Sequence, residues 1–148
     1  MRIPTKARYG LRAMLDLAMH EAHRRPILLK DVAARQGISE SYLGQIFILL
    51  RHAGLVRGAR GAGGGFMLAR PPQEISLLEV VEACIGDMKM VDCVGKRESC
   101  RRADSCAARS VWTEVDRAMR QVLEGKNLSG LAEAQKVMEA DLATMYYI

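Results

Sequence analysis

The stretch that decides the fold spans residues 31–68 and reads DVAARQGISESYLGQIFILLRHAGLVRGARGAGGGFML. Its first part predicts a short helix over 31–36, because Gly37 follows it where a glycine commonly ends a helix. Ser39 is placed to cap a second helix, which closes at Gly54. Two helices joined by a tight glycine-containing turn predict a helix-turn-helix, although an ordinary helical hairpin has the same pattern.

In a helix-turn-helix the second helix lies in the DNA major groove, and its first turn contacts base edges. Here that turn offers Glu40, Ser41, Tyr42 and Gln45. We expect the last three to contact DNA. A preceding helix, expected over residues 6–22, carries Arg8 and Arg12 one turn apart, so both can reach phosphates.

The next segment, residues 55–68, is typical of a strand, a glycine-rich turn and a second strand, after an expected short strand over 27–29. A β-hairpin directly after a recognition helix is the order of a winged helix. Gly63 and Gly64 let the backbone approach a narrow groove, and Arg57 and Arg60 supply positive charge. A phosphate-binding loop is excluded, because no Gly-Lys-Ser/Thr follows and no helix begins there.

The positive charge of the chain lies in its first half. Residues 1–75 contain 12 Lys/Arg and 5 Asp/Glu, a net charge of +7. The remaining 10 Lys/Arg and 12 Asp/Glu give residues 76–148 a net charge of −2. This asymmetry indicates a polyanionic partner for the first half, or a solvated basic face without a partner.

The sequence has no run of 18 apolar residues and no apolar core of a signal peptide near its start, so we expect a cytoplasmic protein without a membrane span. Disulfides are unusual there, and clustered cysteines more often bind metal or sense redox state. Cys-x-x-Cys is absent, and no histidine lies near a cysteine in sequence. We therefore expect no enzymatic activity.

Three of the four cysteines lie in one polar stretch, residues 92–106, which reads DCVGKRESCRRADSC. Cys93, Cys100 and Cys106 are spaced Cys-x6-Cys-x5-Cys, without the paired Cys-x2–4-Cys of structural zinc sites. Three thiolates favour an iron–sulfur cluster or a redox switch. The surrounding basic residues can offset cluster charge and lower thiol pKa values; they are Lys89, Lys96, Arg97, Arg101 and Arg102. Cys84, on an apolar helix, is interpreted as structural.

Prolines at 71 and 72 mark a boundary between a winged-helix domain, 1–72, and a second part, 73–148. Ser76 and Glu79 form a capping-box pattern that opens a helix to about residue 85. The second part then holds the cysteine loop (87–106), a long helix over about 105–123 and a last short helix from about 127. The long helix has an apolar stripe, which packs within the chain or forms a dimer interface; its residues are Val111, Val115, Ala118, Met119 and Val122.

Nearly the whole chain resembles the Rrf family of bacterial winged-helix regulators. The segments that carry the resemblance begin at Lys6 (KARYGLRAM), at Gly37 (GIS, then SYL) and at Leu55 (LVR, then RGAGGGF). The family includes the iron–sulfur regulator IscR, the nitric-oxide sensor NsrR and the cysteine-metabolism repressor CymR. The resemblance implies DNA contacts from Ser41, Tyr42 and Arg60, and dimerisation through the long helix. It also implies a [2Fe-2S] or [4Fe-4S] cluster on the three loop cysteines.

The chain departs from the family at three positions. The fourth cluster ligand is a histidine or an aspartate in the two cluster-binding branches, and the matching positions hold Arg109 and Arg8. The remaining candidates for that ligand are Asp92, Asp104, His20, His23, water or a small thiol. Gly44 replaces a glutamate that helps to select operators.

The sequence therefore predicts a mainly α protein with a small β-hairpin wing. It is expected to be a homodimeric regulator, acting as a repressor on a near-palindromic double-stranded operator, with DNA binding modulated by the cluster. The alternative is a cluster-free regulator, controlled by thiol redox state or by docking a metabolic enzyme, such as one of cysteine biosynthesis.

Overall fold

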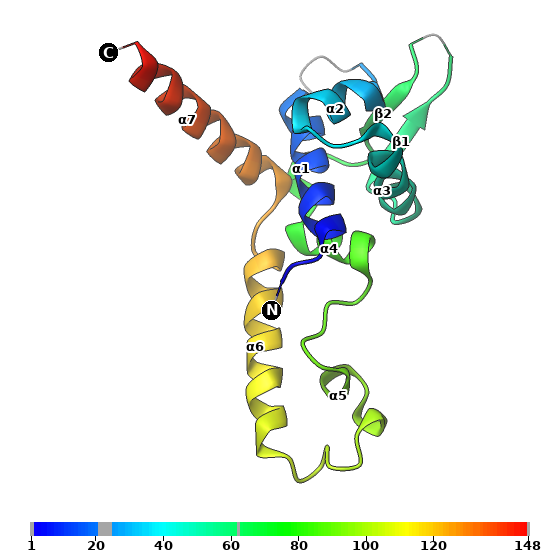
Figure 1. Ribbon diagram of the computed structural model, residues 1–148, viewed down its shortest axis with the longest axis vertical. Coiled ribbons are helices and arrows are strands. Elements are labelled where there is room, and N and C mark those ends of the chain that lie inside the picture. The colour runs from blue at the N-terminus through cyan, green and yellow to red at the C-terminus, as the bar shows by residue number, and fades with distance from the viewer. Residues whose placement is uncertain (1, 21–24, 62, 148) are drawn as a thin grey trace.

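The computed structural model describes residues 2–20, 25–61 and 63–147. It is mainly helical with one two-stranded antiparallel sheet, as predicted (Figure 1). The helices and strands, in chain order, are α1 Thr5–His20, α2 Leu29–Gln36, α3 Glu40–His52, β1 Val56–Ala59, β2 Gly65–Leu68, α4 Leu77–Ile85, α5 Asp92–Gly95, α6 Ala107–Glu124 and α7 Leu128–Tyr146, with 3-10 turns η2 at Pro72–Glu74 and η3 at Arg97–Ser99.

The predicted helix-turn-helix is confirmed in α2 and α3. Gly37 adopts φ 62° and ψ 39° at the end of α2, a left-handed conformation that glycine accepts without a Cβ penalty. Ser39 then caps α3, since its hydroxyl accepts a 3.3 Å hydrogen bond from the Tyr42 backbone N–H. The turn is therefore set by two local signals that are readable in the sequence.

The wing is the hairpin of β1 and β2, with Val56 opposite Leu68 and Ala59 opposite Gly65. The strand expected over 27–29 is reduced to a single bridge, in which Ile27 exchanges backbone hydrogen bonds of 2.9 and 2.8 Å with Phe66. The strand cannot continue because Leu29 already begins α2. This bridge ties the wing to the start of the helix-turn-helix.

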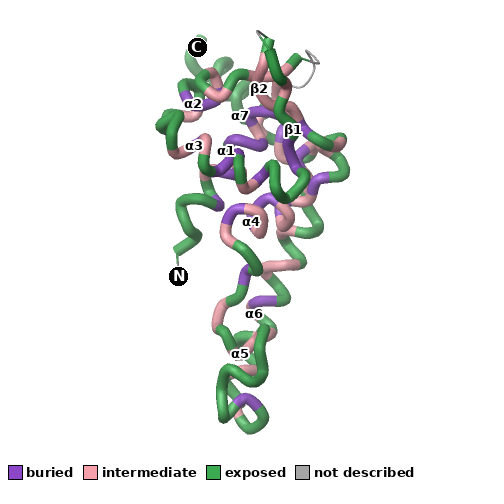
Figure 2. The backbone as a smooth tube through the Cα atoms, turned by 90° about the vertical axis from the view of Figure 1, so that its right-hand side faces the viewer, coloured by how far each residue is buried: buried purple, intermediate pink, exposed green. Residues whose placement is uncertain are grey.

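The core lies where α1, α3 and α4 meet beneath the wing, and Figure 2 shows the buried positions gathered in this upper part. Phe47 is 1% exposed and packs against Phe66 with ring centroids 4.5 Å apart. The helices α1 and α4 pack very closely, because a Cβ at Gly10 would lie 2.3 Å from Cys84 Sγ. Gly10 is thus the residue that lets these two helices meet.

Replacing Gly10 with alanine is expected to lower the free energy of unfolding by about 2 kcal/mol, because α1 and α4 must separate. Denaturant unfolding measures the change. The double variant Gly10→Ala/Cys84→Ala removes the sulfur that the new methyl group meets, so it should be more stable than Gly10→Ala alone. Equal stability of the single and double variants would contradict this packing account.

Charged side chains fasten α1 to the helix-turn-helix. Asp16 is 2% exposed and accepts hydrogen bonds from Arg35 at 2.6 and 2.9 Å and from Gln36 at 3.0 Å. Arg12 donates to the side-chain and backbone oxygens of Gln36. Arg12, expected to reach phosphates beside Arg8, is thus bonded within the protein and helps to hold the turn.

The capping box at the start of α4 is confirmed. Ser76 accepts from the Glu79 backbone N–H, and the Glu79 carboxylate accepts from the Ser76 backbone N–H at 2.9 Å. Arg70 also donates to Glu79 at 2.6 Å. Burial alone would raise the pKa of Glu79, but the hydrogen bonds from Arg70 and Ser76 outweigh it, so this pKa is lowered. The box joins the wing to α4 through one carboxylate.

Glu79 makes stability depend on pH. The pKa of Glu79 is lower in the folded than in the unfolded state. Its contribution to stability is therefore fully present above the ordinary glutamate pKa, and it is lost as the pH falls through the pKa of the folded state. The stability difference between wild type and Glu79→Gln should therefore be largest near pH 7 and shrink below about pH 4. Thermal unfolding from pH 3 to 8 measures it, with the exposed Glu133→Gln as a charge-matched control; a difference that grows with acidity would contradict the account.

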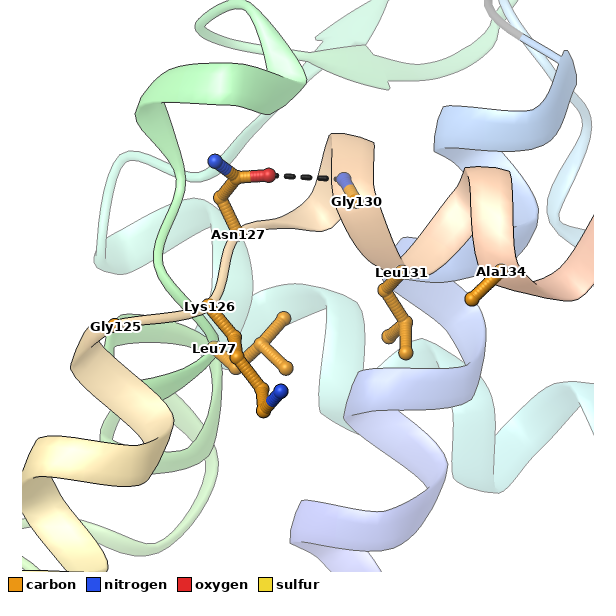
Figure 3. Close-up of a pocket in the computed structure, with 7 residues that line it drawn as sticks. All are labelled: Leu77, Gly125, Lys126, Asn127, Gly130, Leu131 and Ala134. Atoms are coloured by element: carbon orange, nitrogen blue, oxygen red, sulfur yellow. Dashed lines mark hydrogen bonds between the residues drawn. The ribbon is translucent and has the colours of Figure 1, made fainter.

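The last helix is longer than predicted: α7 spans 19 residues rather than forming a short helix. Its start is fixed by Asn127, whose Oδ1 accepts from the Gly130 N–H at 2.9 Å, beside a shallow pocket of about 340 Å³ (Figure 3). Leu128 and Ala132 are buried, whereas residues 136–147 are exposed, and α7 projects from the body in Figure 1. Within the described residues, no helix is long and apolar enough to cross a membrane.

Candidate nucleic-acid interface and cysteine loop

The first turn of α3 presents polar side chains outward. Ser41 and Gln45 are exposed. Tyr42 is half-buried and meets Tyr9 of α1 edge to face, with ring centroids 5.9 Å apart. This aromatic pair fixes the direction of Tyr42 beside the two free polar side chains. The turn can offer hydrogen bonds to base edges, which stays a prediction for all three residues.

The other predicted DNA-contacting residues flank this helix. Arg57 and Arg60 are exposed on and just after β1, and Gly63 is exposed in the turn of the wing while Gly64 is half-buried. Arg8 is exposed near the start of α1 and donates to Thr5 Oγ1 at 3.1 Å. The three arginines leave their charge accessible to phosphates, and their contacts with DNA remain predictions.

Gly44 lies within α3 and faces α2. A Cβ at this position would only make an ordinary 3.6 Å contact with Leu29. Glycine inside a helix costs about 1 kcal/mol relative to alanine. Nothing in the packing explains this glycine.

The cysteine loop contains more regular structure than expected, since α5 and η3 interrupt it. Cys93 lies on α5, Cys100 follows η3, and Cys106 is the residue before α6. All three are free; Cys100 is exposed and the other two are half-buried. Thiolates suit an iron–sulfur cluster. Across residues 2–20, 25–61 and 63–147, however, no three His, Cys, Asp or Glu side chains are placed to hold a metal ion.

Arginine side chains hold this loop in place. Arg109, in the first turn of α6, donates from Nε to the Cys93 carbonyl oxygen at 2.8 Å. Arg97 forms an ion pair with Asp104. The loop is therefore fastened to the first turn of α6 through Arg109.

The candidates for a fourth ligand are unequally placed. Asp104 is engaged by Arg97, and His20 Nδ1 lies 2.7 Å from the Asp16 carbonyl oxygen at the far end of α1. His23 lies outside the described residues. Asp92 is exposed on α5, next to Cys93.

Cys84 differs from the loop cysteines, as its position on an apolar helix indicated. It is 5% exposed in the core between α1 and α4. Burial raises the pKa of its thiol to about 11, against a smaller opposite effect of Lys6. Cys84 is thus protonated near neutral pH and packs as a small apolar residue.

The apolar stripe of α6 is largely uncovered. Val111 and Val122 are 54% and 58% exposed, and Ala118 is exposed, whereas Val115 and Met119 are half-buried. An apolar groove of about 380 Å³ runs beside the stripe, lined by Ile3, Met88, Ala118, Met119, Val122 and Leu123. The structure leaves this face available to a partner.

The opposite, polar side of α6 was missed by the sequence analysis. Arg120 binds Asp116 of its own helix and also Glu82 of α4 and Asp87 of the loop. The i, i+4 spacing of Asp116 and Arg120 is readable in the sequence. The partners on α4 and the loop are not, because they depend on how the chain folds back.

Comparisons with known proteins agree on one family. The Rrf2 model, described as an iron-dependent transcriptional regulator, matches residues 3–134. The HTH-type transcriptional regulator IscR of Xenorhabdus nematophila is 38% identical over 139 residues, 94% of this chain and 84% of that protein. Solved structures of similar fold include CymR, the global cysteine regulator of B. subtilis, with a TM-score of 0.77 and 33% identity over 90% of this chain and 98% of that one. T. potens IscR has a TM-score of 0.74 and 36% identity over 93% and 90%.

Proposed function

Because the chain belongs to the Rrf2 family and is a helix-turn-helix transcriptional regulator rather than an enzyme, we propose that an iron–sulfur cluster modulates its binding to operator DNA. In this proposal it is a cytoplasmic homodimer that acts as a repressor. The domain boundary near residue 72 is part of the proposal, with residues 1–72 reading DNA and residues 73–148 providing dimerisation and control.

The DNA-binding part of the proposal rests on the exposed polar turn of α3 and on the charged wing. Ser41, Tyr42 and Gln45 would read base edges in the major groove. Arg8, Arg57 and Arg60 would contact phosphates, with the backbone at Gly63 and Gly64 close to the narrow groove. Such contacts imply binding that weakens steeply with salt.

The observation that carries the cluster proposal is that three free thiols lie on one loop that leads directly into α6. Cys93, Cys100 and Cys106 would hold the cluster, and Asp92 is the fourth ligand we favour because it adjoins Cys93. When bound, a cluster supplies a redox-active centre that is lost when iron is scarce or when oxidants attack it. Since the described loop is not an assembled metal site, binding must rearrange it, and this rearrangement would be the signal.

Anaerobic purification, followed by a visible spectrum and iron and sulfide counts, tests the cluster proposal. The wild-type protein should be brown and should contain sulfide, whereas Cys93→Ala should be colourless. Cys84→Ala is the matched control, because it removes a thiol that lies in the core, and it should stay brown. A colourless wild-type protein after reconstitution with iron and sulfide would sink the cluster proposal and leave the DNA-binding head standing.

The exposed stripe of α6 supports the proposed homodimer. Val111, Val115, Ala118, Met119 and Val122 would form its interface. A two-fold axis through α6 would place two α3 helices about 34 Å apart, one DNA turn, and so favour a near-palindromic operator. Light scattering of Val122→Glu should then show dissociation, while the exposed Glu133→Gln on α7 stays dimeric.

The alternative is cluster-free control. It is supported by the hydrogen bond from Arg109 to the Cys93 carbonyl oxygen, which attaches the loop to α6 through protein groups. The loop thiols would then respond to oxidants, or the protein would dock an enzyme of cysteine biosynthesis. Metal-free protein whose DNA affinity changes on thiol oxidation, or on addition of such an enzyme, would favour this function.

A further inference from the structure

Arg120 gathers three separate segments of the chain. Its Nε donates to Asp116 of α6 at 3.2 Å, and its Nη1 donates to Glu82 of α4 at 2.8 Å. Its Nη2 donates to Asp87 and, at 2.9 Å, to the carbonyl oxygen of Met88, both at the start of the cysteine loop. One guanidinium therefore joins α6, α4 and the start of the cysteine loop.

The planar guanidinium group of Arg120 is difficult to replace with another side chain. Three carboxylates converge on it, and Lys89 is bonded to the outer one, with Nζ 2.5 Å from Asp87 Oδ2. Asp116 is only 7% exposed, so removing Arg120 would leave a buried carboxylate without its ion-pair partner. Burial would lower the pKa of Arg120, but attraction to Glu82 and hydrogen bonds to the carboxylates raise it overall. Lysine would keep the charge but lose the planar, multidentate geometry.

The loop is bonded to one face of α6 at two points. Arg109 and Arg120 are 11 residues apart, so at about 100° per residue they point within about 20° of each other. Arg109 holds the Cys93 carbonyl, and Arg120 holds Asp87 and the Met88 carbonyl. The segment between Met88 and Cys93 thus spans two anchors on the same helix face. If the loop rearranges around its thiols, it must move relative to both of these anchors.

The Arg120 contacts also reach the DNA-binding head. Met88 packs in a small apolar cluster with Ala7 of α1 and Val81 of α4. Ala7 precedes Arg8, one of the predicted phosphate contacts. Glu82, the second Arg120 partner, lies one position after Val81 on α4, which packs against α1. These contacts give a displacement of Met88 or Glu82 a continuous packed route to the helix that carries Arg8.

We infer that Arg120 is a positioning residue that couples the state of the cysteine loop to the DNA-binding head. When the Arg120 guanidinium makes its hydrogen bonds to α4 and the loop, movement of the loop shifts α4 and α1. When these hydrogen bonds are lost, the loop moves independently of the head. The inference rests on the proposed function, in which the loop state sets DNA affinity.

The test uses Arg120→Lys, with Arg117→Lys as the matched control on the exposed side of the same helix. Asp87→Asn is the second variant, because Asp87 is exposed and its loss should leave folding intact. Operator affinity is measured for each full-length protein before and after reconstitution with iron and sulfide. For wild type and Arg117→Lys, the operator affinities before and after reconstitution should differ by a factor of at least about ten, which corresponds to about 1.4 kcal/mol. Arg120→Lys should reduce the ratio to below about twofold, and Asp87→Asn to an intermediate value.

A purely structural role of Arg120 would lower affinity in both states equally and leave the ratio unchanged, and this result would overturn the inference. A ratio near one already in wild type would instead overturn the proposed function, and the inference with it. Hydrogen exchange of metal-free protein adds a readout that needs neither cluster nor DNA. Arg120→Lys should speed exchange over residues 86–93 and Arg117→Lys should not; equal exchange in both variants would also overturn the inference.

Discussion

The double variant Arg57→Gln/Arg60→Gln is expected to bind operator DNA about a hundred- to a thousandfold more weakly than wild type at physiological salt. Both side chains are exposed on the wing. Each arginine that contacts a phosphate adds about 0.9 to the slope of log affinity against log salt. A dimer would lose four such charges, so its slope should fall by about 3.6. Fluorescence anisotropy at several salt concentrations measures both quantities.

The control for the wing variant is Lys126→Gln/Lys136→Gln, which removes the same charge from two exposed positions, one just before α7 and one within it. It should change the affinity less than about threefold and leave the slope unchanged. Because long-range attraction depends on total charge, equal losses in the two double variants would mean that the wing contributes only net charge. That outcome would remove the wing from the interface.

Gly65→Ala is expected to lower the free energy of unfolding by about 3 kcal/mol, from backbone strain together with overpacking. Gly65 adopts φ 145°, and a Cβ there would lie 2.5 Å from the Ile27 carbonyl oxygen. That oxygen accepts the hydrogen bond that ties the wing to the helix-turn-helix. DNA affinity should fall together with stability, because the wing loses its anchor.

Gly63→Ala is the matched control for Gly65→Ala, because nothing lies within 4 Å of a Cβ at Gly63. Its free energy of unfolding should stay within about 0.5 kcal/mol of wild type. Denaturant unfolding of the two variants separates a steric requirement at Gly65 from a general preference for glycine in this turn. Equal stabilities would show that the close approach to Ile27 is relieved without cost.

Local signals made several helix ends predictable. Gly37, Ser39 and the pair Ser76 and Glu79 each fix a helix end through bonds within a few residues, and all were recognised in the sequence. The strand expected near Ile27 was wrong in extent, because its pairing depends on the distant Phe66. The length of the last helix was underestimated. Residues 136–147 are exposed, so they carry no buried face whose apolar pattern would mark a helix in the sequence.

The cysteine loop was the least predictable part. The three thiols were evident from composition, and Cys84 was separated from them by its apolar neighbours. The bonds that hold the loop come from Arg109 and Arg120 on α6, and they are long-range contacts that no spacing rule indicates. Arg109 was noted only as a departure from the family. Its structural role emerges from the contact with Cys93.

The most direct test of the account is to compare operator affinity of the metal-free and the reconstituted protein, both kept anaerobic, at fixed salt. The account predicts that the two affinities differ at least about tenfold for one operator, and that Cys93→Ala abolishes the difference while Cys84→Ala keeps it. Equal affinities at every operator tried, with a cluster present by iron and sulfide count, would contradict the account.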